Sequence, residues 1–242
     1  MLKVNNVKYT VRSQMGNKTK FIVRNVNFTL DAGYIMCLIG KNGSGKSTLL
    51  QLLYGIMPVE QGNVLWFDYE IYDNSERVRQ DIAYVGAETG FFENRTIVEN
   101  VEILSLLYPE FNHEKWDDYL KRFGLENMSE VQRFTDFSTG QKRQIQLAFA
   151  MSRSPKLLLL DEPTANLDPV FRVEFMDLLQ QLIATEEMSI IISTHILDDV
   201  EEIADYIGIM SDGEMVLLGD RKSILKQQEN DTLEKLMIER AT

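Results

Sequence analysis

Apolar and polar residues alternate along the first 30 positions of the chain, from Leu2 to Val11 and again from Val26 to Leu30. A period of two residues is typical of strands that bury one face. The polar segment 14–17 separates the two runs, so the pattern predicts an antiparallel pair of strands. The segment Ile35–Ile39 is apolar throughout, which indicates a buried central strand.

Helical spacing follows that strand and returns in a long middle segment. Leucines at positions 49, 50, 52 and 53 predict a helix that Gly55 and Pro58 end. Between residues 88 and 151 the apolar residues recur at helical spacing and glycine is sparse. Helix starts and ends are predicted there at Thr96 and Pro109, at Asn112 and Gly124, and at Gln141 and Met151.

Strands and helices alternate again after residue 152. Strands are predicted at 157–160 and 189–193, a helix at 170–184, and a closing hairpin at 206–218. These patterns predict one α/β domain with a mostly parallel core sheet, an N-terminal antiparallel β subdomain and a helical subdomain. Within 1–242 we expect the core and β subdomain in 1–87 and 152–220, the helical subdomain in 88–151 and a C-terminal helical tail in 221–242.

The composition is globular and the charge is strongly acidic. Hydrophobic residues make up 44% of the chain, and 25 Lys and Arg against 37 Asp and Glu give a net charge of −12. The negative electrostatic potential of such a chain repels nucleic acid. An anion can bind only where a local set of hydrogen-bond donors or cations overcomes this repulsion. The single Cys37 excludes an internal disulfide. With no signal segment and no run of ~18 apolar residues, we expect an intracellular chain without a membrane span of its own.

A glycine-rich loop between the predicted central strand and its helix carries the strongest chemical signal. Residues 40–48 match the phosphate-loop pattern G-x-x-x-x-G-K-[ST]. Glycines let successive backbone N–H groups turn toward a phosphate chain, and the helix N-terminus adds positive potential. Lys46 is expected to reach the β and γ oxygens, and the Ser47 hydroxyl to ligate Mg²⁺. The other candidate phosphate-binding residues are Gly40, Lys41, Asn42, Gly43, Ser44, Gly45 and Thr48.

Two carboxylates end the predicted strand 157–160. Asp161 and Glu162 are expected to face the phosphate loop, because ligands bind at the carboxyl ends of parallel strands. Asp161 is predicted to hold Mg²⁺, directly or through water. Glu162 is predicted to orient or deprotonate a water for in-line attack on the γ-phosphate. Together with the phosphate loop, this pair indicates nucleotide hydrolysis.

Ser138, Gly140 and Gln141 stand at the start of a predicted helix and form a second candidate anion site. Serine and glycine at such a position are also ordinary capping residues, and this alternative stays open. The phosphate loop already supplies a complete set of donors for the phosphates of one nucleotide. A second phosphate-binding site therefore suggests that two chains bind the same nucleotide.

The set of motifs resembles the ATP-binding subunit of ABC transporters, in the drug, antibiotic and peptide exporter branch. The resemblance covers nearly the whole chain and follows the family's order. It rests on the Walker A loop 40–48, the signature Ser138-Thr139-Gly140-Gln141, the Walker B segment 157–162, the D-loop Ala165-Asn166-Leu167-Asp168, and His195.

This resemblance implies a P-loop NTPase fold with ATP and Mg²⁺ as cofactors. It implies a homodimer or heterodimer in which ATP on one Walker A loop is also gripped by Ser138 and Gly140 of the other subunit. It further implies that His195 contacts the γ-phosphate, that Asp168 belongs to the nucleotide site, and that transmembrane permease subunits hold the protein at the cytoplasmic face of the cell membrane. No nucleic-acid partner is expected.

Two positions depart from the family's pattern. The family has a glutamine where Gly86-Ala87 stand here, and either Glu88 or water takes over its metal contact. The aromatic that stacks on adenine is expected at Val11, so Tyr9 on the same strand face, or another side chain, serves instead. The helical segment 88–151, with the loop 87–92 at its root, is the candidate docking surface for the membrane partner. Phe91 and Phe92 of this loop suit such a contact if their rings are exposed and belong to the core if they are buried.

Two alternative functions predict other sequence features. A soluble ABC-type ATPase that acts on nucleic acid or ribosomes usually carries two nucleotide domains or long insertions, and no heptad arm or cysteine pair lies between Lys46 and Asp161. A GTPase should show an N-K-x-D guanine site, which Asn17-Lys18-Thr19-Lys20 lacks. A small-molecule kinase would leave Ser138 and His195 unexplained. ATP-driven transport therefore accounts for more of the sequence.

Overall fold

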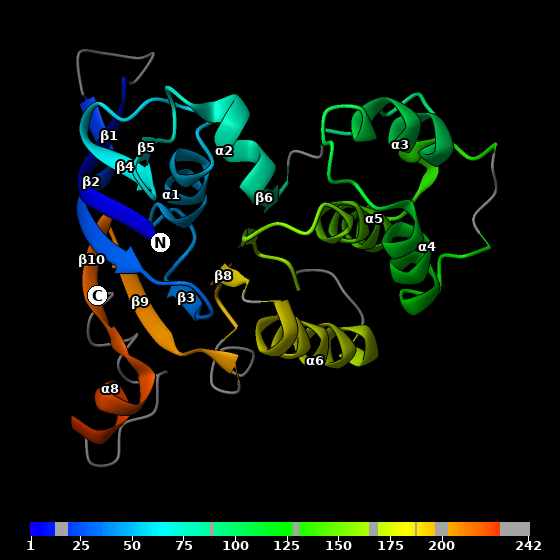
Figure 1. The fold of residues 1–242 in the computed structure, drawn as a ribbon. Helices are drawn as coiled ribbons and strands as arrows, with labels where there is room; N and C mark the ends of the chain where they lie inside the picture. The colour runs from blue at the N-terminus through cyan, green and yellow to red at the C-terminus, as the bar shows by residue number, and fades with distance from the viewer. Residues whose placement is uncertain are drawn as a thin grey trace.

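The computed structural model describes residues 1–12, 19–87, 90–127, 131–164, 169–186, 188–196 and 203–227. Within them the chain forms an antiparallel sheet, a mostly parallel sheet and a group of helices beside the parallel sheet (Figure 1). This arrangement confirms the predicted α/β fold class. The predicted turn at 14–17, the D-loop at 165–168 and the tail beyond residue 227 lie outside the described residues.

The antiparallel sheet has the strand order β2-β1-β4-β5. β1 (Leu2–Arg12) pairs with β2 (Thr19–Leu30), with Leu2 opposite Leu30 and Val4 opposite Phe28. These four residues are buried, as the period of two predicts. β4 (Gln61–Trp66) and β5 (Tyr69–Glu70) extend the sheet beyond β1. The predicted pair of N-terminal strands is confirmed.

The parallel sheet has the order β10-β9-β3-β8-β7-β6. β10 runs antiparallel to β9, and the other neighbours pair in parallel. Because β3, β8 and β7 are neighbours, the segments that follow them meet at one edge of the sheet. The strand bounds are β3 (Ile35–Ile39), β6 (Ile82–Val85), β7 (Leu157–Asp161), β8 (Ser189–Thr194), β9 (Tyr206–Ser211) and β10 (Glu214–Asp220).

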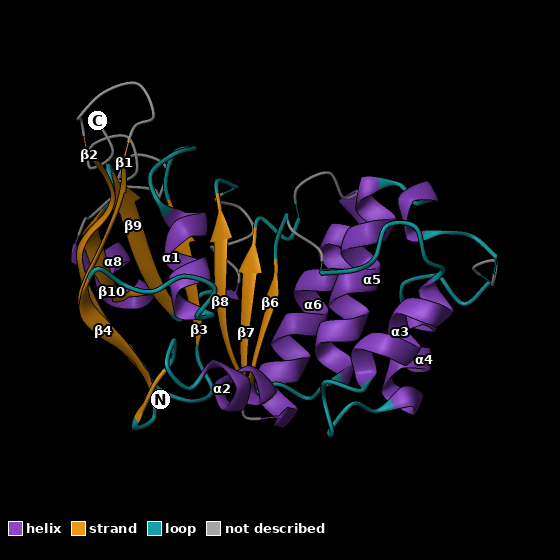
Figure 2. Ribbon diagram, turned by 90° about the horizontal axis from the view of Figure 1, so that it is seen from above, coloured by secondary structure: helices purple, strands orange, loops and turns teal. Residues whose placement is uncertain are grey.

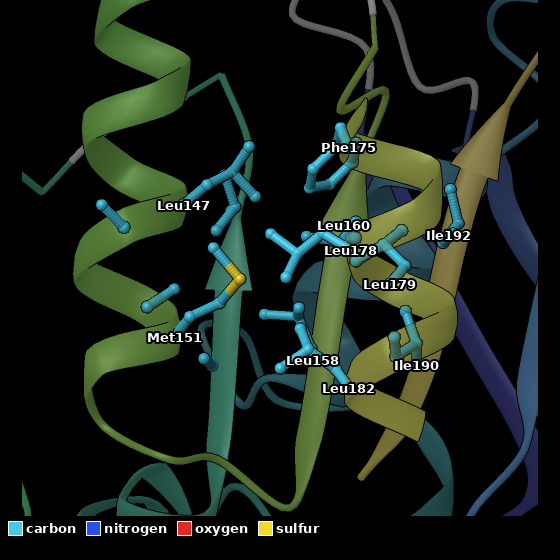
Figure 3. Close-up of a cluster of buried hydrophobic side chains, with 14 of the residues drawn as sticks. Leu147, Met151, Leu158, Leu160, Phe175, Leu178, Leu179, Leu182, Ile190 and Ile192 are labelled. Atoms are coloured by element: carbon cyan, nitrogen blue, oxygen red, sulfur yellow. The ribbon is translucent and has the colours of Figure 1, made fainter. Parts of the chain in front are cut away.

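Both faces of the parallel sheet are covered. On one face, Leu158 and Leu160 of β7 pack with apolar side chains of α5 (Thr139–Ser152) and α6 (Pro169–Glu186), as Figure 3 shows. On the other face, Leu157 and Leu159 join a core formed with the antiparallel sheet, α1 (Lys46–Leu53) and α2 (Ser75–Asp81). This double burial explains why the central strands are apolar throughout.

α3 (Ile97–Ser105) and α4 (His113–Arg122) lie on the side of the molecule away from the antiparallel sheet (Figure 2). A single 3₁₀ turn (Phe134–Asp136) precedes α5, and α8 (Arg221–Gln227) follows β10. The predicted helix starts at Thr96 and Asn112 are confirmed, because both side chains cap the helices that follow them. α5 begins at Thr139, earlier than the predicted Gln141, since Ser138 is its N-cap.

Candidate functional site

The phosphate loop leads from β3 into α1 through two glycines that a side chain would strain. Gly43 has a φ of +82° and Gly45 a φ of +105°. A Cβ at Gly45 would also collide with the carbonyl oxygen of Ile22. Gly45 is the N-cap of α1, and no side-chain hydrogen bond caps this helix. The N-terminal N–H groups of α1 are therefore available to an anion.

Lys46 is buried at the base of this loop. Its Nζ donates to the carbonyl oxygens of Gly40 at 2.7 Å and Lys41 at 3.3 Å, and it lies 3.7 Å from Oε1 of Glu162. Burial lowers the pKa of Lys46, while the carboxylates of Glu162 and Asp161 act in the opposite direction. The loop thus fixes a cation at the place where a phosphate would enter.

Asp161 ends β7 between two hydroxyl groups. Its Oδ1 accepts hydrogen bonds from Ser47 Oγ at 3.0 Å and from Ser193 Oγ at 2.5 Å. The side chain is buried, and Ser47 beside it is exposed at the pocket. A carboxylate and a hydroxyl are the kinds of oxygen ligand that Mg²⁺ takes from a protein when phosphates supply others. Ser47 and Asp161 therefore fit a magnesium site in their chemistry.

Glu162 follows in a backbone conformation that non-glycine residues seldom adopt, with a φ of +49°. Its backbone N–H donates to the carbonyl and hydroxyl oxygens of Ser193, each at 3.1 Å. Oε2 of Glu162 lies 2.6 Å from Nδ1 of His195, and Oε1 faces Lys46. The strained turn therefore holds this carboxylate between a histidine and a lysine.

Lys46, Ser47, Glu162 and His195 line one pocket of about 500 Å³, a size typical of small-molecule sites, and the buried Asp161 is hydrogen-bonded to Ser47 at its wall. The lining residues are Ile22, Asn42, Gly43, Gly45, Lys46, Ser47, Thr48, Glu162 and His195. Gly40, Lys41 and Ser44 belong to the same loop. The buried hydroxyl of Ser44 has no hydrogen-bond partner among the residues that the structure describes. One chain therefore brings together the predicted loop, its lysine, the acidic pair and His195.

Tyr9, the residue expected to stack on adenine, does not line this pocket among the described residues. Its side chain is half-buried and packs against the core between the antiparallel sheet and α1. Val7 and Tyr9 lie on the same face of β1, as the two-residue period of a strand requires, and both contact this core. Ile22 of β2 lines the pocket, and Val11 is exposed.

Ser138, Gly140 and Gln141 lie at the start of α5, outside the lining of this pocket. Ser138 Oγ accepts from the Gln141 N–H at 3.2 Å, and the Ser138 N–H donates to Gln141 Oε1 at 3.0 Å. This capping box is the capping role that the sequence left open. Because Ser138 is exposed, its hydroxyl also faces solvent. Asp168 lies outside the described residues.

A second cavity, of about 380 Å³, lies between the core sheet and the helical segment. Arg153 stacks over Tyr108 at 3.5 Å and Arg79 over Tyr54 at 5.2 Å. In the described part of the chain, the buried Nε atoms of both arginines lack a hydrogen-bond partner. The lining residues are Tyr54, Ile56, Arg79, Tyr84, Val85, Gly90, Phe91, Leu104, Tyr108, Gln146, Phe149, Ala150 and Arg153.

The loop between β6 and α3 buries one phenylalanine and exposes the other. Phe91 is 8% exposed and stacks on Phe134, with ring centroids 4.8 Å apart. Phe92 is 47% exposed. The buried Asn100 fixes its backbone, because Oδ1 accepts from the Phe92 N–H at 2.7 Å and Nδ2 donates to the Phe92 carbonyl at 3.1 Å. Phe91 is core, whereas Phe92 is presented on the surface.

Three residues of the site are absent from the sequence-based set, namely Ile22, which lines the pocket, and two residues that contact Asp161. Ser193 binds the Asp161 carboxylate, and the hydroxyl of Tyr84 lies 3.4 Å from Oδ2 of Asp161. Ser193 had a detectable signal, since it is a polar residue in the apolar run of β8. Tyr84 had none, because tyrosine is common in strands. Glu88, the alternative to the family's glutamine, lies outside the described residues.

Comparison with known proteins gives consistent matches. The family model described as "ABC transporter" matches residues 23–165. The chain is 31% identical to the linearmycin resistance ATP-binding protein LnrL of Bacillus subtilis (strain 168), over 98% of this chain and 75% of LnrL. It is 32% identical to the lantibiotic transport ATP-binding protein SrtF of Streptococcus pyogenes, over 90% of each chain. It is also similar to the dimeric post-hydrolysis structure of the ATP-binding cassette MJ0796 bound to ADP and Pi, with a TM-score of 0.81 and 26% identity over 91% of this chain and 98% of that one.

Proposed function

The chain belongs to the ATP-binding proteins of ABC transporters, and from this membership we propose that it hydrolyses ATP in a head-to-tail dimer that drives export through separate transmembrane permease subunits. The observation that carries the proposal is the convergence of Lys46, Asp161 and Glu162 on the phosphate loop. A fixed cation, two acids and open backbone donors are the groups that transfer of a γ-phosphoryl group to water requires.

The polar residues of the site have separate tasks in this proposal. The backbone N–H groups of 40–48 and the ammonium of Lys46 bind the β- and γ-phosphates. Glu162 orients or deprotonates the attacking water, and His195, 2.6 Å from Glu162, contacts the γ-phosphate. Ser47 and Asp161 would hold Mg²⁺, which supplies charge neutralisation at the phosphate oxygens when it is bound.

The dimer completes the site in this proposal. Ser138 and Gly140 of one subunit bind the γ-phosphate held by the phosphate loop of the other, with Gln141 and Asp168 at the same interface. Two observations support the sharing: Ser138 is exposed at a helix N-terminus, and it lies outside the pocket of its own chain. The similar cassette MJ0796 is dimeric in its ADP and Pi state. The second subunit is a copy of this chain or a related ATP-binding subunit.

The proposed location is the cytoplasmic face of the cell membrane, where permease subunits hold the protein peripherally. None of the helices in the described ranges combines the length and apolarity that a membrane crossing needs. The direction of transport is inferred from the relatives, because LnrL is named for resistance to linearmycin and SrtF for transport of a lantibiotic. Our proposal that this chain drives export is based on its similarity to these two proteins.

The permease is proposed to dock at the second cavity and on the adjoining ring of Phe92. The cavity combines aromatic rings with the positive charge of Arg79 and Arg153, whose guanidinium groups backbone carbonyl oxygens hold in place. An apolar permease segment that carries a carboxylate complements such a surface. Phe92 adds an exposed ring on a backbone that Asn100 fixes, so little ordering is needed on binding.

Sedimentation and phosphate release of the purified protein test the proposed function. We expect a monomer without nucleotide and a dimer with Mg²⁺ and the non-cleavable analogue AMP-PNP. With its permease subunits present, the protein should release phosphate from ATP in a Mg²⁺-dependent reaction. A protein that stays monomeric with the analogue and releases no phosphate beside its permease would contradict the proposal.

Replacing Phe92 with Ser should weaken binding to the permease by about tenfold, because the substitution removes an exposed aromatic anchor. Nucleotide affinity of the isolated subunit should not change. The matched control is Phe67→Ser, since Phe67 is also 47% exposed but lies beside Trp66 of the antiparallel sheet. Equal permease affinity for the two variants, measured by titration against the permease in detergent, would place the docking surface elsewhere.

A further inference from the structure

Tyr84 of β6 lines the second cavity and also contacts Asp161, the proposed metal ligand. Its hydroxyl lies 3.4 Å from Oδ2 of Asp161, at the proposed metal site. Its ring stacks on that of Tyr54, with centroids 5.6 Å apart and planes 25° from parallel. Both rings line the second cavity, between the core sheet and the helical segment. One side chain therefore touches the proposed metal ligand at one end and a proposed docking surface along its ring.

The contact to Asp161 complements the hydrogen bonds that this carboxylate already has. Oδ1 accepts from the hydroxyls of Ser47 and Ser193, so one oxygen is held from two sides. Oδ2 has Tyr84 as its hydrogen-bond partner within the described ranges. The hydroxyl of Tyr84 thus limits rotation of the carboxylate about its last bond, which the two serines at a single oxygen leave freer.

A phenol carries its proton at neutral pH, so the hydroxyl of Tyr84 acts as the donor and the Asp161 carboxylate as the acceptor.

The local sequence makes room for this arrangement. A Cβ at Gly86 would collide with the hydroxyl of Tyr84, so a residue with a side chain at that position would displace it. Gly86 also stands at the departure from the family's glutamine pattern. The absence of a side chain at Gly86 therefore leaves the space in which the hydroxyl of Tyr84 contacts Asp161.

We propose that Tyr84 is a positioning residue, whose hydroxyl orients Oδ2 of Asp161 for metal binding and whose ring makes this orientation depend on the packing of the second cavity. The inference rests on the proposed role of Asp161 as a metal ligand. It assigns to a phenol of β6 the link between the docking cavity and the metal site.

Mn²⁺ binding in the presence of AMP-PNP, followed by electron paramagnetic resonance, tests the first half of this inference. In the full-length protein, Tyr84→Phe should weaken Mn²⁺ binding by about tenfold, the usual effect of removing a group that orients a metal ligand. Affinity for a fluorescent ATP analogue in EDTA should not change, because the phosphate loop is intact. Unchanged Mn²⁺ affinity in Tyr84→Phe would overturn the inference. If the unsubstituted protein bound no Mn²⁺, the proposed metal site itself would fail.

Two substitutions at Tyr54 test the second half. Tyr54→Phe keeps the stacked ring and should leave Mn²⁺ affinity as it is in the unsubstituted protein. Tyr54→Ala removes the ring that stacks on Tyr84 and leaves Asp161 unchanged. It should weaken Mn²⁺ binding severalfold, which is less than the effect of Tyr84→Phe. Thermal unfolding identifies the temperature at which each variant is still folded for the titration. A folded Tyr54→Ala protein with full Mn²⁺ affinity would refute the link to the cavity.

Discussion

ATP turnover should fall by roughly 10²–10⁴-fold when Glu162 is replaced by Gln, the range that loss of a general base produces, while ATP binding stays intact. The amide keeps the size of the carboxylate but cannot take a proton from the attacking water. Lys46 remains anchored by the carbonyl oxygens of Gly40 and Lys41, so the phosphate grip persists. Because the dimer can then close without hydrolysis, ATP should trap it in the closed state. Phosphate release, a fluorescent ATP analogue and sedimentation measure the three effects.

Glu93→Gln is the matched control for this substitution. Glu93 is also a carboxylate paired with a lysine, at 2.9 Å from Lys142, but it lies on the surface of the helical segment. Its replacement should leave turnover unchanged. Normal turnover in Glu162→Gln would remove Glu162 from the catalytic role and direct attention to His195.

The parts of the fold that could be predicted carry a local signal. β7 reads as four consecutive leucines because its residues divide between two cores, and Thr96 marks the start of α3 with its capping box. The phosphate loop is equally local, since nine consecutive residues, 40–48, supply its glycines, lysine and hydroxyls. In such elements, the residues that determine the local structure are the same residues that form the sequence pattern.

Elements with a weak local signal were missed. α2 (Ser75–Asp81) is short and polar and buries Val78 alone among its residues, and β5 (Tyr69–Glu70) has two residues. Neither has enough apolar positions to show a period. Tertiary packing, which sequence patterns do not report, decides their structure.

Tertiary structure also explains why some site residues were missed. Ile22 reaches the pocket because β2 passes beside Gly45, and Ser193 reaches Asp161 because β8 is the neighbour of β7 in the sheet. Tyr9 was assigned to adenine stacking from the face of its strand, its half-buried ring packs against the core on the same side as Val7, and its role at the nucleotide stays a prediction. Strand order and register determine these placements, and neither can be read from one strand alone.

Replacing Ser138 with Arg should abolish dimer formation with AMP-PNP and lower turnover by at least about 100-fold, while nucleotide binding to the monomer stays unchanged. The reason is geometric: Ser138 is exposed at the N-terminus of α5, and the small hydroxyl leaves space for the phosphate of a second subunit. An arginine fills this space and adds a cation at the positive end of the helix. The pocket around Lys46 is untouched because Ser138 does not line it. Sedimentation with the analogue and titration of a fluorescent ATP analogue measure the two outcomes.

The substitution also removes an N-cap, which costs roughly 0.5–2 kcal/mol of stability, so the loss of the dimer must be separated from the loss of the cap. Thr96→Arg provides this control. Thr96 caps α3 with a capping box of the same form as that of Ser138, so both variants lose equivalent hydrogen bonds. Thr96→Arg should still dimerise with AMP-PNP. If Ser138→Arg instead lost nucleotide binding as a monomer, Ser138 would belong to the site of its own chain, and the two-chain arrangement would be wrong.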